Sequence, residues 1–518
     1  MISRRIHTAV LICAVANLAL VIGCRGSFGE SSDPCSDLAA LPLIDLFISS
    51  SQRVSASGDM PAHCQVEGVI ETEIQFELLL PESSAWNGRF LMGGGGGFVG
   101  TVQNQARTLY AHGGSPLQRG YATVGTDTGH AGGGIEASWA LDNPTRQMNW
   151  GYRAVHLTAE AAKSIIAEYY GRAADYSYFV GCSRGGGQAM MESQRYPDDF
   201  DGIVAAAPAY NWTAFTAGFL QAQQAMFPNG GDDDPVVREA TLQLLGSSIL
   251  SVCDAEDGVL DGVMTDPRRC SFSTGDLVIC ADDVAADGCV TRRELAAIEA
   301  VYNGPTVDGE SIFFGFNYGG ENDSGGWDSW VVSSDRQRAR GNPNAQYGFG
   351  TEFYKYFVFE DKAWDYTAYD FSTWREDVAR ISPVVDATDT DLSVFRDRGG
   401  KIIYWTGWSD LALTPLGTID YYEQLEVSDS AARDYARLYM LPGVLHCSGG
   451  PGPDQVDWVE AIRAWVENGD APERLIASKL DSLGQTTMTR PVCPYPEFAA
   501  YDGTGDPSVD SSFSCSVR

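Results

Sequence analysis

The feature that most constrains the fold is a tight turn between an expected strand and an expected helix. Residues 178–180 (Tyr-Phe-Val) are typical of a buried strand, and a helical pattern carrying Met190 and Met191 follows. Between them lies Gly181-Cys182-Ser183-Arg184-Gly185, which matches Gly-x-Ser-x-Gly. Glycines flank the serine because so sharp a turn leaves no room for side chains, and the hydroxyl is exposed at a helix N-terminus that favours negative charge. The segment predicts a nucleophilic Ser183, and the alternative is a glycine-rich turn without chemistry.

Strand-like and helix-like segments alternate on both sides of this turn. Strands are expected at 66–81 (a hairpin or meander), 89–92, 121–126, 177–180, 202–206, 401–405 and 435–440, and helices at 150–170, 185–195 and 457–467. Such alternation predicts a parallel sheet with helices packed against it. With the serine turn, it predicts an α/β-hydrolase fold.

The character of the chain changes after Pro208. Residues 211–390 are rich in Gly, Asp and aromatic residues, lack regular alternation and hold four cysteines. We therefore expect an inserted lid domain at 211–390, and a catalytic domain made of residues 25–210 and 391–518.

A serine nucleophile in this fold needs an acid and a histidine later in the chain, in the order Ser, acid, His. Of the six histidines, His446 alone follows Ser183 and is the candidate base. Asp410, just after the strand expected at 401–405, is the candidate acid that holds the imidazole tautomer and stabilises the imidazolium. Its rivals lie in an apparent helix or a polar connection: Asp420, Asp429 and Asp434.

Two backbone N–H groups should stabilise the oxyanion. One belongs to Arg184, the residue after the nucleophile. The other should come from the glycine run 93–97, which follows an early strand, and Gly96 is our candidate. The run also resembles a phosphate-binding loop, but no Lys-Ser/Thr pair follows it.

The N-terminus is typical of an exported chain. Arg4 and Arg5 precede an apolar run at 8–22 that is too short to span a membrane, so residues 1–24 are expected to be a signal peptide. Val21-Ile22-Gly23-Cys24 resembles a bacterial lipobox, in which Cys24 would be lipidated; an ordinary signal peptide cut nearby is the alternative. We expect a bacterial protein that is periplasmic, anchored to the outer membrane or secreted, with membrane contact only through that lipid.

Charge and cysteine content narrow the class of protein further. The net charge of −34 argues against a nucleic-acid partner, because phosphates need Lys and Arg. Beyond Cys13 and Cys24 there are ten cysteines, an even number that indicates disulfides in an exported chain. The sequence alone does not choose their pairing, and Cys182 could equally be a core residue or itself a nucleophile.

The chain resembles the tannase/feruloyl esterase family, which includes mono(2-hydroxyethyl) terephthalate hydrolases. The resemblance rests on His63-Cys64-x-Val66-x-Gly68, Trp86-Asn87-Gly88-Arg89-Phe90, the glycine run with Phe98 and Gly100, Gly181-Cys182-Ser183-x-Gly185-Gly186, the acidic loop at 254–263, and His446-Cys447. It implies a serine carboxylesterase that cleaves small esters of hydroxycinnamic, gallic or terephthalic-type acids through an acyl-enzyme.

The resemblance also implies a disulfide framework. In that family the cysteine before the nucleophile is bonded to the cysteine after the catalytic histidine, here Cys182 and Cys447. By analogy the other pairs are Cys35–Cys64, Cys253–Cys270, Cys280–Cys289 and Cys493–Cys515.

A structural calcium ion in the lid is a further implication of the resemblance. Carboxylates of Asp254, Asp257 and Asp261, with the carbonyls of Val259 and Val263, would form the oxygen cage that this hard cation prefers. Without the resemblance, the same segment would equally be a solvated acidic turn.

The lid is expected to set the substrate. It carries many aromatic residues, most of them expected in its own core: Phe313, Phe314, Phe316, Trp327, Trp330, Phe349, Phe353, Tyr354, Phe357 and Trp364. Arg336, Arg338 and Arg340 could pair with a substrate carboxylate but are expected to be solvated. The alternatives left open are a cysteine-nucleophile hydrolase using Cys182, a non-catalytic calcium-dependent binding lipoprotein, and a peptidase with the same triad.

Overall fold

The computed structural model describes residues 33–107, 114–339 and 341–517. The expected signal peptide, with Cys24, lies outside the described residues. From Pro34 onward the chain forms one compact unit. None of the described helices combines the length and hydrophobicity needed to span a membrane.

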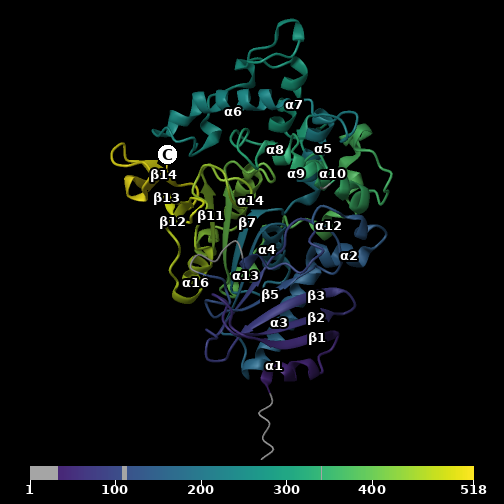
Figure 1. Ribbon diagram of the computed structural model, residues 1–518, viewed down its shortest axis with the longest axis vertical. Coiled ribbons are helices and arrows are strands. Elements are labelled where there is room, and N and C mark those ends of the chain that lie inside the picture. Colours follow the sequence, from purple (N-terminus) through teal and green to yellow (C-terminus); the bar gives the residue numbers. More distant parts are fainter. Residues whose placement is uncertain (1–32, 108–113, 340, 518) are drawn as a thin grey trace, which may run out of the picture. The chain divides into compact units, whose positions relative to one another are not determined.

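Nine strands of the described chain form one mixed sheet, in the order β1-β2-β3-β5-β4-β6-β7-β10-β11 (Figure 1). The antiparallel part comprises β1 (Leu46–Val54), β2 (His63–Ile70), β3 (Ile74–Pro81) and its contact with β5 (Ala122–Thr126). The parallel part comprises β5, β4 (Arg89–Gly93), β6 (Tyr176–Ser183), β7 (Gly202–Pro208), β10 (Lys401–Gly407) and β11 (Ala436–Leu441). The expected α/β-hydrolase type of sheet is confirmed.

Helices cover both faces of this sheet. Alternate strand residues point to opposite faces, so Phe179 and Ile203 face α3 (Ala154–Tyr170), α4 (Arg184–Arg195) and α14 (Pro415–Ser428). Their neighbours Val180 and Val204 face α16 (Trp458–Asn468) on the other side. The strands are buried on both faces, which explains their nearly continuous apolar character.

The segment expected as a lid lies between β7 and β10, which pair directly with each other. It is more helical than its sequence suggests. It holds α5 (Trp212–Met226), α6 (Glu239–Cys253), α7 (Arg292–Asn303), α8 (Trp327–Trp330), α9 (Asp335–Arg338), α10 (Ala345–Phe353), α11 (Trp374–Val378) and α12 (Ser382–Val385), with the short pair β8 (Thr306–Val307) and β9 (Glu310–Ser311). The helix α13 (Ser393–Asp397) follows this segment and precedes β10. Figure 1 shows α5 to α10 gathered at one end of the sheet.

Shorter elements complete the fold. They are α1 (Pro34–Asp37), α2 (Pro144–Met148), α15 (Ala432–Tyr435) and two C-terminal antiparallel pairs, β12 (Leu475–Leu480) with β13 (Thr486–Val492) and β14 (Phe498–Tyr501) with β15 (Phe513–Ser516). The strands expected from the sequence include neither these pairs nor β1. The three serines at 49–51 conceal the alternation of β1, an edge strand with few buried residues.

Candidate active site

Ser183 lies at the sharp turn between β6 and α4. Its backbone has φ 64° and ψ −123°, a conformation that is costly for a residue with a side chain and is typical of functional sites. The turn needs its glycines, since a Cβ on Gly181 would lie 2.4 Å from the carbonyl carbon and oxygen of Gly185. The predicted strand–turn–helix setting of Ser183 is therefore present.

A glutamine that the sequence analysis missed holds this turn from the side. Gln105 accepts a hydrogen bond from the Cys182 N–H (2.8 Å) and donates one to the Cys182 carbonyl (3.2 Å). A Cβ on Gly185 would lie 2.2 Å from the Gln105 Oε1 atom, so this glycine makes the contact sterically feasible. Gln105 belongs to no motif, and no signal in the sequence singles it out.

His446 and Asp410 form a hydrogen-bonded pair. The imidazole Nδ1 lies 2.9 Å from Asp410 Oδ2, so a protonated Nδ1 donates to the carboxylate and leaves Nε2 for the other side of the ring. The other oxygen, Oδ1, accepts from the N–H groups of Ala412 (2.8 Å) and Leu413 (2.9 Å). The Asp410 side chain is fully buried, and these bonds compensate its desolvation.

The rival acids do not approach His446 in this way. Asp420 lies on α14 and bonds Gln424, and Asp429 pairs with Arg396 and bonds Tyr435. Asp434 lies in the short helix α15. The acid loop and the histidine loop are instead tied directly, because the Ser409 N–H donates to the Val444 carbonyl at 3.1 Å.

A disulfide connects the serine loop to the histidine loop. Cys182 and Cys447 are bonded, with 6.0 Å between their Cα atoms and 265 positions between them in sequence. Each is adjacent to one of the predicted catalytic residues, so the bond restricts the separation of Ser183 and His446. A half-cystine has no thiolate to offer, which removes the cysteine-nucleophile alternative for this form of the protein.

The other four expected pairs are also formed among the described residues: Cys35–Cys64, Cys253–Cys270, Cys280–Cys289 and Cys493–Cys515. The connectivity implied by the family resemblance is confirmed in full.

The glycine run lies beside the nucleophile, and some of its N–H groups already donate hydrogen bonds to side chains. The Gly95 N–H donates to Gln188 Oε1 (3.0 Å), and the N–H of Gly96, the predicted donor, is bound to Gln103 Oε1 (2.8 Å). The next residue, Gly97, borders the same pocket as Ser183. It has φ 56°, and a Cβ there would meet the Gly134 carbonyl oxygen at 2.2 Å, so a glycine is needed at this position.

An apolar pocket opens at Ser183. Its walls come from the glycine run, the start of the insertion, α8, α10 and the acid loop: Gly97, Ala209, Trp212, Phe215, Phe219, Trp330, Phe349, Ala412 and Leu413. The Trp330 ring also meets the His446 ring edge to face, with centroids 5.1 Å apart. Trp330 therefore contacts the predicted base and also lines the pocket at the predicted nucleophile.

Two of the aromatic residues predicted for the insertion, Trp330 and Phe349, line this pocket. Others belong to the core of the insertion, as expected, including Phe313, Phe353, Tyr354 and Phe357. Arg336 and Arg338 are exposed and do not border the pocket, and Arg340 lies outside the described residues. The three aromatic residues of α5 that line the pocket (Trp212, Phe215 and Phe219) were not predicted.

The side chain of Arg184 is buried directly behind the nucleophile. Its guanidinium lies 4.0 Å from the centre of the Trp150 ring and donates to the carbonyls of Trp150 and Gly151 (2.7 Å for Gly151). Burial lowers the pKa of Arg184 to about 9. This side chain braces the first turn of α4 from inside the protein.

The acidic loop predicted to bind calcium follows α6. Asp254 Oδ1 accepts from the Gly262 N–H (2.8 Å), and Asp257 Oδ2 accepts from Thr265 Oγ1 (2.6 Å). Asp261 Oδ1 accepts from the Val263 N–H (3.1 Å), while its Oδ2 pairs with buried Arg490 (2.8 Å). Burial, with a smaller contribution from Asp261, raises the pKa of Asp257.

The loop thus folds around its own carboxylates, and the N–H of Val259 donates to Asp257 Oδ1. The three aspartates are not among the groups of three or more ligand side chains with ligand atoms within 4.8 Å of one another in the described chain. Their oxygen chemistry suits calcium, but in the structure their carboxylates are turned toward loop N–H groups and Arg490.

Comparisons with known proteins agree on one family. Residues 59–516 match the model of a family described as tannase and feruloyl esterase. An uncharacterized esterase of Xanthomonas campestris is 34% identical, over 95% of this chain and 93% of its own length. A mono(2-hydroxyethyl) terephthalate hydrolase of Piscinibacter sakaiensis is 35% identical, over 90% of this chain and 87% of its own.

Solved structures agree as well. The crystal structure of an esterase from Aspergillus oryzae superposes with a TM-score of 0.82 at 25% identity, and covers 93% of this chain and 99% of its own. The similarity extends over the insertion as well as the sheet, since so little of either chain is left out.

Proposed function

We propose that this chain, which belongs to the tannase and feruloyl esterase family and is a carboxylic ester hydrolase, cleaves small esters of aromatic acids. Ser183 is the proposed nucleophile. The observation that carries the proposal is the apolar, aromatic-lined pocket at Ser183, whose wall residue Trp330 also contacts His446 of the His446–Asp410 pair. A flat aromatic acyl group suits such walls, because aromatic rings pack with offset or edge-to-face contacts.

In this mechanism His446 removes the Ser183 proton as the hydroxyl attacks the ester carbonyl. Asp410 keeps Nδ1 protonated and stabilises the imidazolium that forms. The imidazolium then protonates the departing alcohol, and an acyl-enzyme remains on Ser183. Water, activated by His446 in the same way, releases the acid.

For the oxyanion we propose the N–H groups of Arg184 and Gly97. Arg184 begins α4, where the helix N-terminus favours negative charge. We prefer Gly97 to Gly96 because the Gly96 N–H is bound to Gln103, whereas Gly97 borders the pocket. Donors that are fixed in advance stabilise the transition state without reorganisation.

The substrate class follows from the pocket and from the relatives. One relative is named as a terephthalate monoester hydrolase and the family as tannase and feruloyl esterase, so terephthalic, gallic and hydroxycinnamic esters are the candidate classes. No arginine borders the described pocket. We therefore propose that acyl groups without a second carboxylate, such as ferulate, are preferred to terephthalate.

Export and calcium complete the proposal. The disulfides among the described residues are compatible with an oxidising compartment outside the cytoplasm, as an exported protein would meet.

Calcium would be held by Asp254, Asp257 and Asp261 with the carbonyls of Val259 and Val263. Its role would be to stabilise the loop, and no step of ester cleavage passes through it.

The test of substrate class compares methyl ferulate, methyl gallate and mono(2-hydroxyethyl) terephthalate under identical conditions. We expect the highest kcat/KM for methyl ferulate or methyl gallate. An aliphatic ester of similar size is the control for non-specific esterase activity. Equal or higher kcat/KM for the aliphatic ester would contradict an aromatic-acid esterase, and a clear preference for the terephthalate would contradict the ordering of acyl groups.

A further inference from the structure

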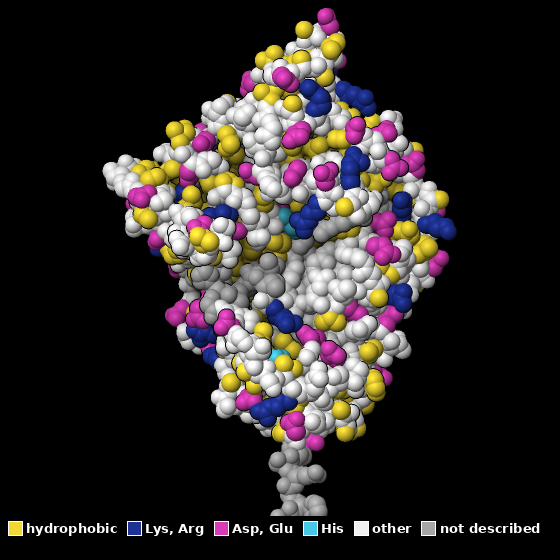
Figure 2. All heavy atoms as spheres, in the orientation of Figure 1, with side chains coloured by type: hydrophobic (Ala, Val, Ile, Leu, Met, Phe, Trp, Pro, Cys, Tyr) yellow, Lys and Arg dark blue, Asp and Glu magenta, His cyan; other side chains and the backbone are white. Residues whose placement is uncertain are grey.

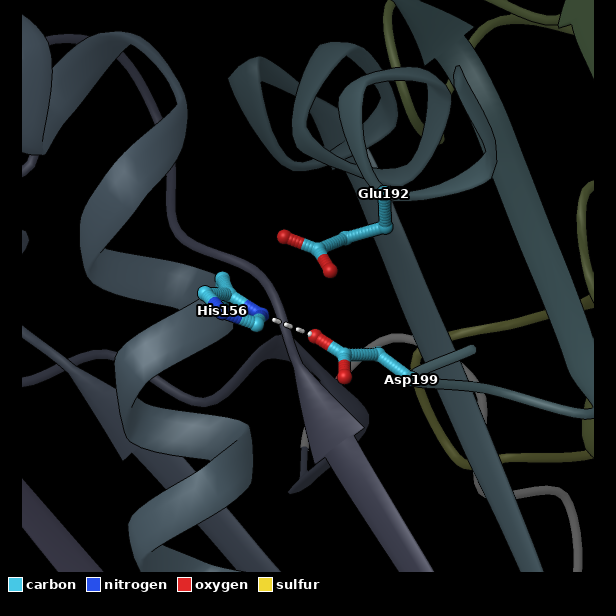
Figure 3. A group of neighbouring side chains, drawn as sticks. All are labelled: His156, Glu192 and Asp199. Carbon is cyan, nitrogen blue, oxygen red and sulfur yellow. Dashed lines mark hydrogen bonds and ion pairs between the residues drawn. The ribbon is translucent and has the colours of Figure 1, made fainter. Parts of the chain in front are cut away.

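Three potential metal ligands converge on the side of the sheet that α3 and α4 cover. His156 lies on α3, Glu192 on α4, and Asp199 in the connection from α4 to β7 (Figure 3). One ligand atom of each lies within 4.8 Å of the others, and within residues 33–107, 114–339 and 341–517 no other such group occurs. The mechanism proposed above uses none of these side chains.

Glu192 is the unusual member of the group. It is fully buried, and no N–H or O–H group of the described residues donates to its carboxylate oxygens, although in its protonated form it can donate to the neighbouring Asp199 carboxylate. Figure 3 shows this carboxylate pointing from α4 toward the space beside His156 and Asp199. Burial and the nearby Asp199 carboxylate raise its pKa well above the usual range. Two buried carboxylates in such proximity are costly unless a proton or a cation lies between them, and a bound cation would compensate both.

The surroundings are rich in negative charge. His156 Nδ1 lies 2.6 Å from Asp199 Oδ2, and its Nε2 lies 3.4 Å from Glu160 Oε2 at the surface. Lys163 is the nearby fixed cation, with its Nζ 3.6 Å from Asp199 Oδ1. Three carboxylates thus face one lysine and a histidine that is charged only when protonated.

We propose that His156, Glu192 and Asp199 bind a divalent transition-metal cation of the Zn²⁺ type. An imidazole nitrogen with two carboxylates is a ligand set that Zn²⁺ accepts, and calcium or magnesium would prefer oxygen alone. The two carboxylates balance the charge of the ion. Glu160 or water completes the coordination, and the partly exposed His156 side chain leaves a route from solvent.

The ion would join α3, α4 and the connection to β7, three segments that no disulfide links among the described residues. Glu192 lies nine residues beyond Ser183 on the helix that the nucleophile begins, which is about 13 Å along its axis. The role is therefore structural: it anchors the far end of the helix whose first turn holds the nucleophile.

The experiment is a Zn²⁺ titration of chelator-treated, dialysed protein by calorimetry, with thermal melts at each metal ratio and calcium in excess throughout. We expect one Zn²⁺ per chain and a higher Tm on binding. Glu192→Gln and His156→Gln should each weaken binding by at least about 10–100-fold and remove the Tm increase. Glu168→Gln, an exposed position on the same α3, is the matched control and should bind like the natural protein.

Co²⁺ provides an independent test, because its visible d–d absorption reports nitrogen and oxygen coordination. The bands should appear in the natural protein and in Glu168→Gln and be lost in His156→Gln. If Glu192→Gln does not fold, His156→Gln decides the question, since its side chain is partly exposed. Absence of stoichiometric Zn²⁺ binding in the natural protein, or binding in the Glu192 and His156 variants as tight as in the natural protein, would overturn the proposal. Neither readout depends on esterase activity.

Discussion

At the scale of single residues, the candidate site is built from side chains whose polar groups are compensated locally. Asp410 is fully buried, and its carboxylate accepts hydrogen bonds from His446 and from two backbone N–H groups.

His130 is a second buried polar residue close to the site. Its Nε2 donates to the Phe98 carbonyl (2.8 Å), next to Gly97, and its ring stacks on Trp139 with centroids 3.5 Å apart. It thereby holds the glycine run in place.

The pH dependence of stability should reveal His130. Burial lowers its pKa to about 4, below the value of about 6.5 in an unfolded chain. Above pH 6.5 the residue is neutral in both states, but as the pH falls toward 4 only the unfolded chain takes up the proton. Stability is therefore lost across this window, by roughly 3 kcal/mol.

Urea unfolding at pH 7 and at pH 4.5 measures this loss. His130→Gln should lose less stability between the two values than the natural protein does. Asp127, whose pKa burial raises to about 6, changes the pH dependence in the opposite direction but does so in both proteins. An identical loss in both proteins would contradict a buried neutral His130.

At the scale of elements, two loops from distant parts of the chain have to meet. The serine turn follows β6 and the histidine loop follows β11, which are separated in the sheet by β7 and β10. The disulfide between Cys182 and Cys447 links the serine turn to the histidine loop. The hydrogen bond between Ser409 and Val444 links the acid loop to the histidine loop. The strands thus fix the approximate positions of these loops, and the disulfide and the Ser409–Val444 hydrogen bond restrict the loops further.

Replacing both Cys182 and Cys447 with alanine should separate these contributions. Loss of a native disulfide typically costs about 2–5 kcal/mol of stability, and a displacement of about 1 Å between reacting groups can cost about 100-fold in rate. We expect a lower unfolding midpoint and a kcat about 10–100-fold lower, with Ser183 still required. The matched control replaces Cys280 and Cys289, whose disulfide lies in the insertion and closes a short loop. A larger loss of kcat in the control would contradict a positioning role.

At the scale of the whole molecule, most of the sheet and the candidate site could be predicted because each had a periodic or motif signal. The serine turn carries the Gly-x-Ser-x-Gly pattern, and chain order leaves one histidine. Other features have no such signal. Gln105 acts through tertiary contacts alone, and the pocket face of α5 (Trp212, Phe215 and Phe219) has the same spacing as any helix packed in a core.

Calcium is a prediction at this scale, since it concerns how the insertion holds together. Chelation should lower the Tm of the natural protein, because an ion that binds only the folded state stabilises it. Asp257→Ala should show a smaller change on chelation, and readdition of Ca²⁺ should restore the Tm of the natural protein alone. The same comparison made in the His156→Gln background excludes a contribution from the zinc site proposed at His156. Active protein that contains no calcium on elemental analysis would contradict the prediction.

The central claim is that Ser183 forms the acyl-enzyme, and the turnover of Ser183→Ala tests it most directly. The account predicts that kcat on the best aromatic ester falls by at least about three orders of magnitude, while the thermal melt and the disulfide content match those of the natural protein. A folded Ser183→Ala protein with turnover close to that of the natural protein would contradict the account.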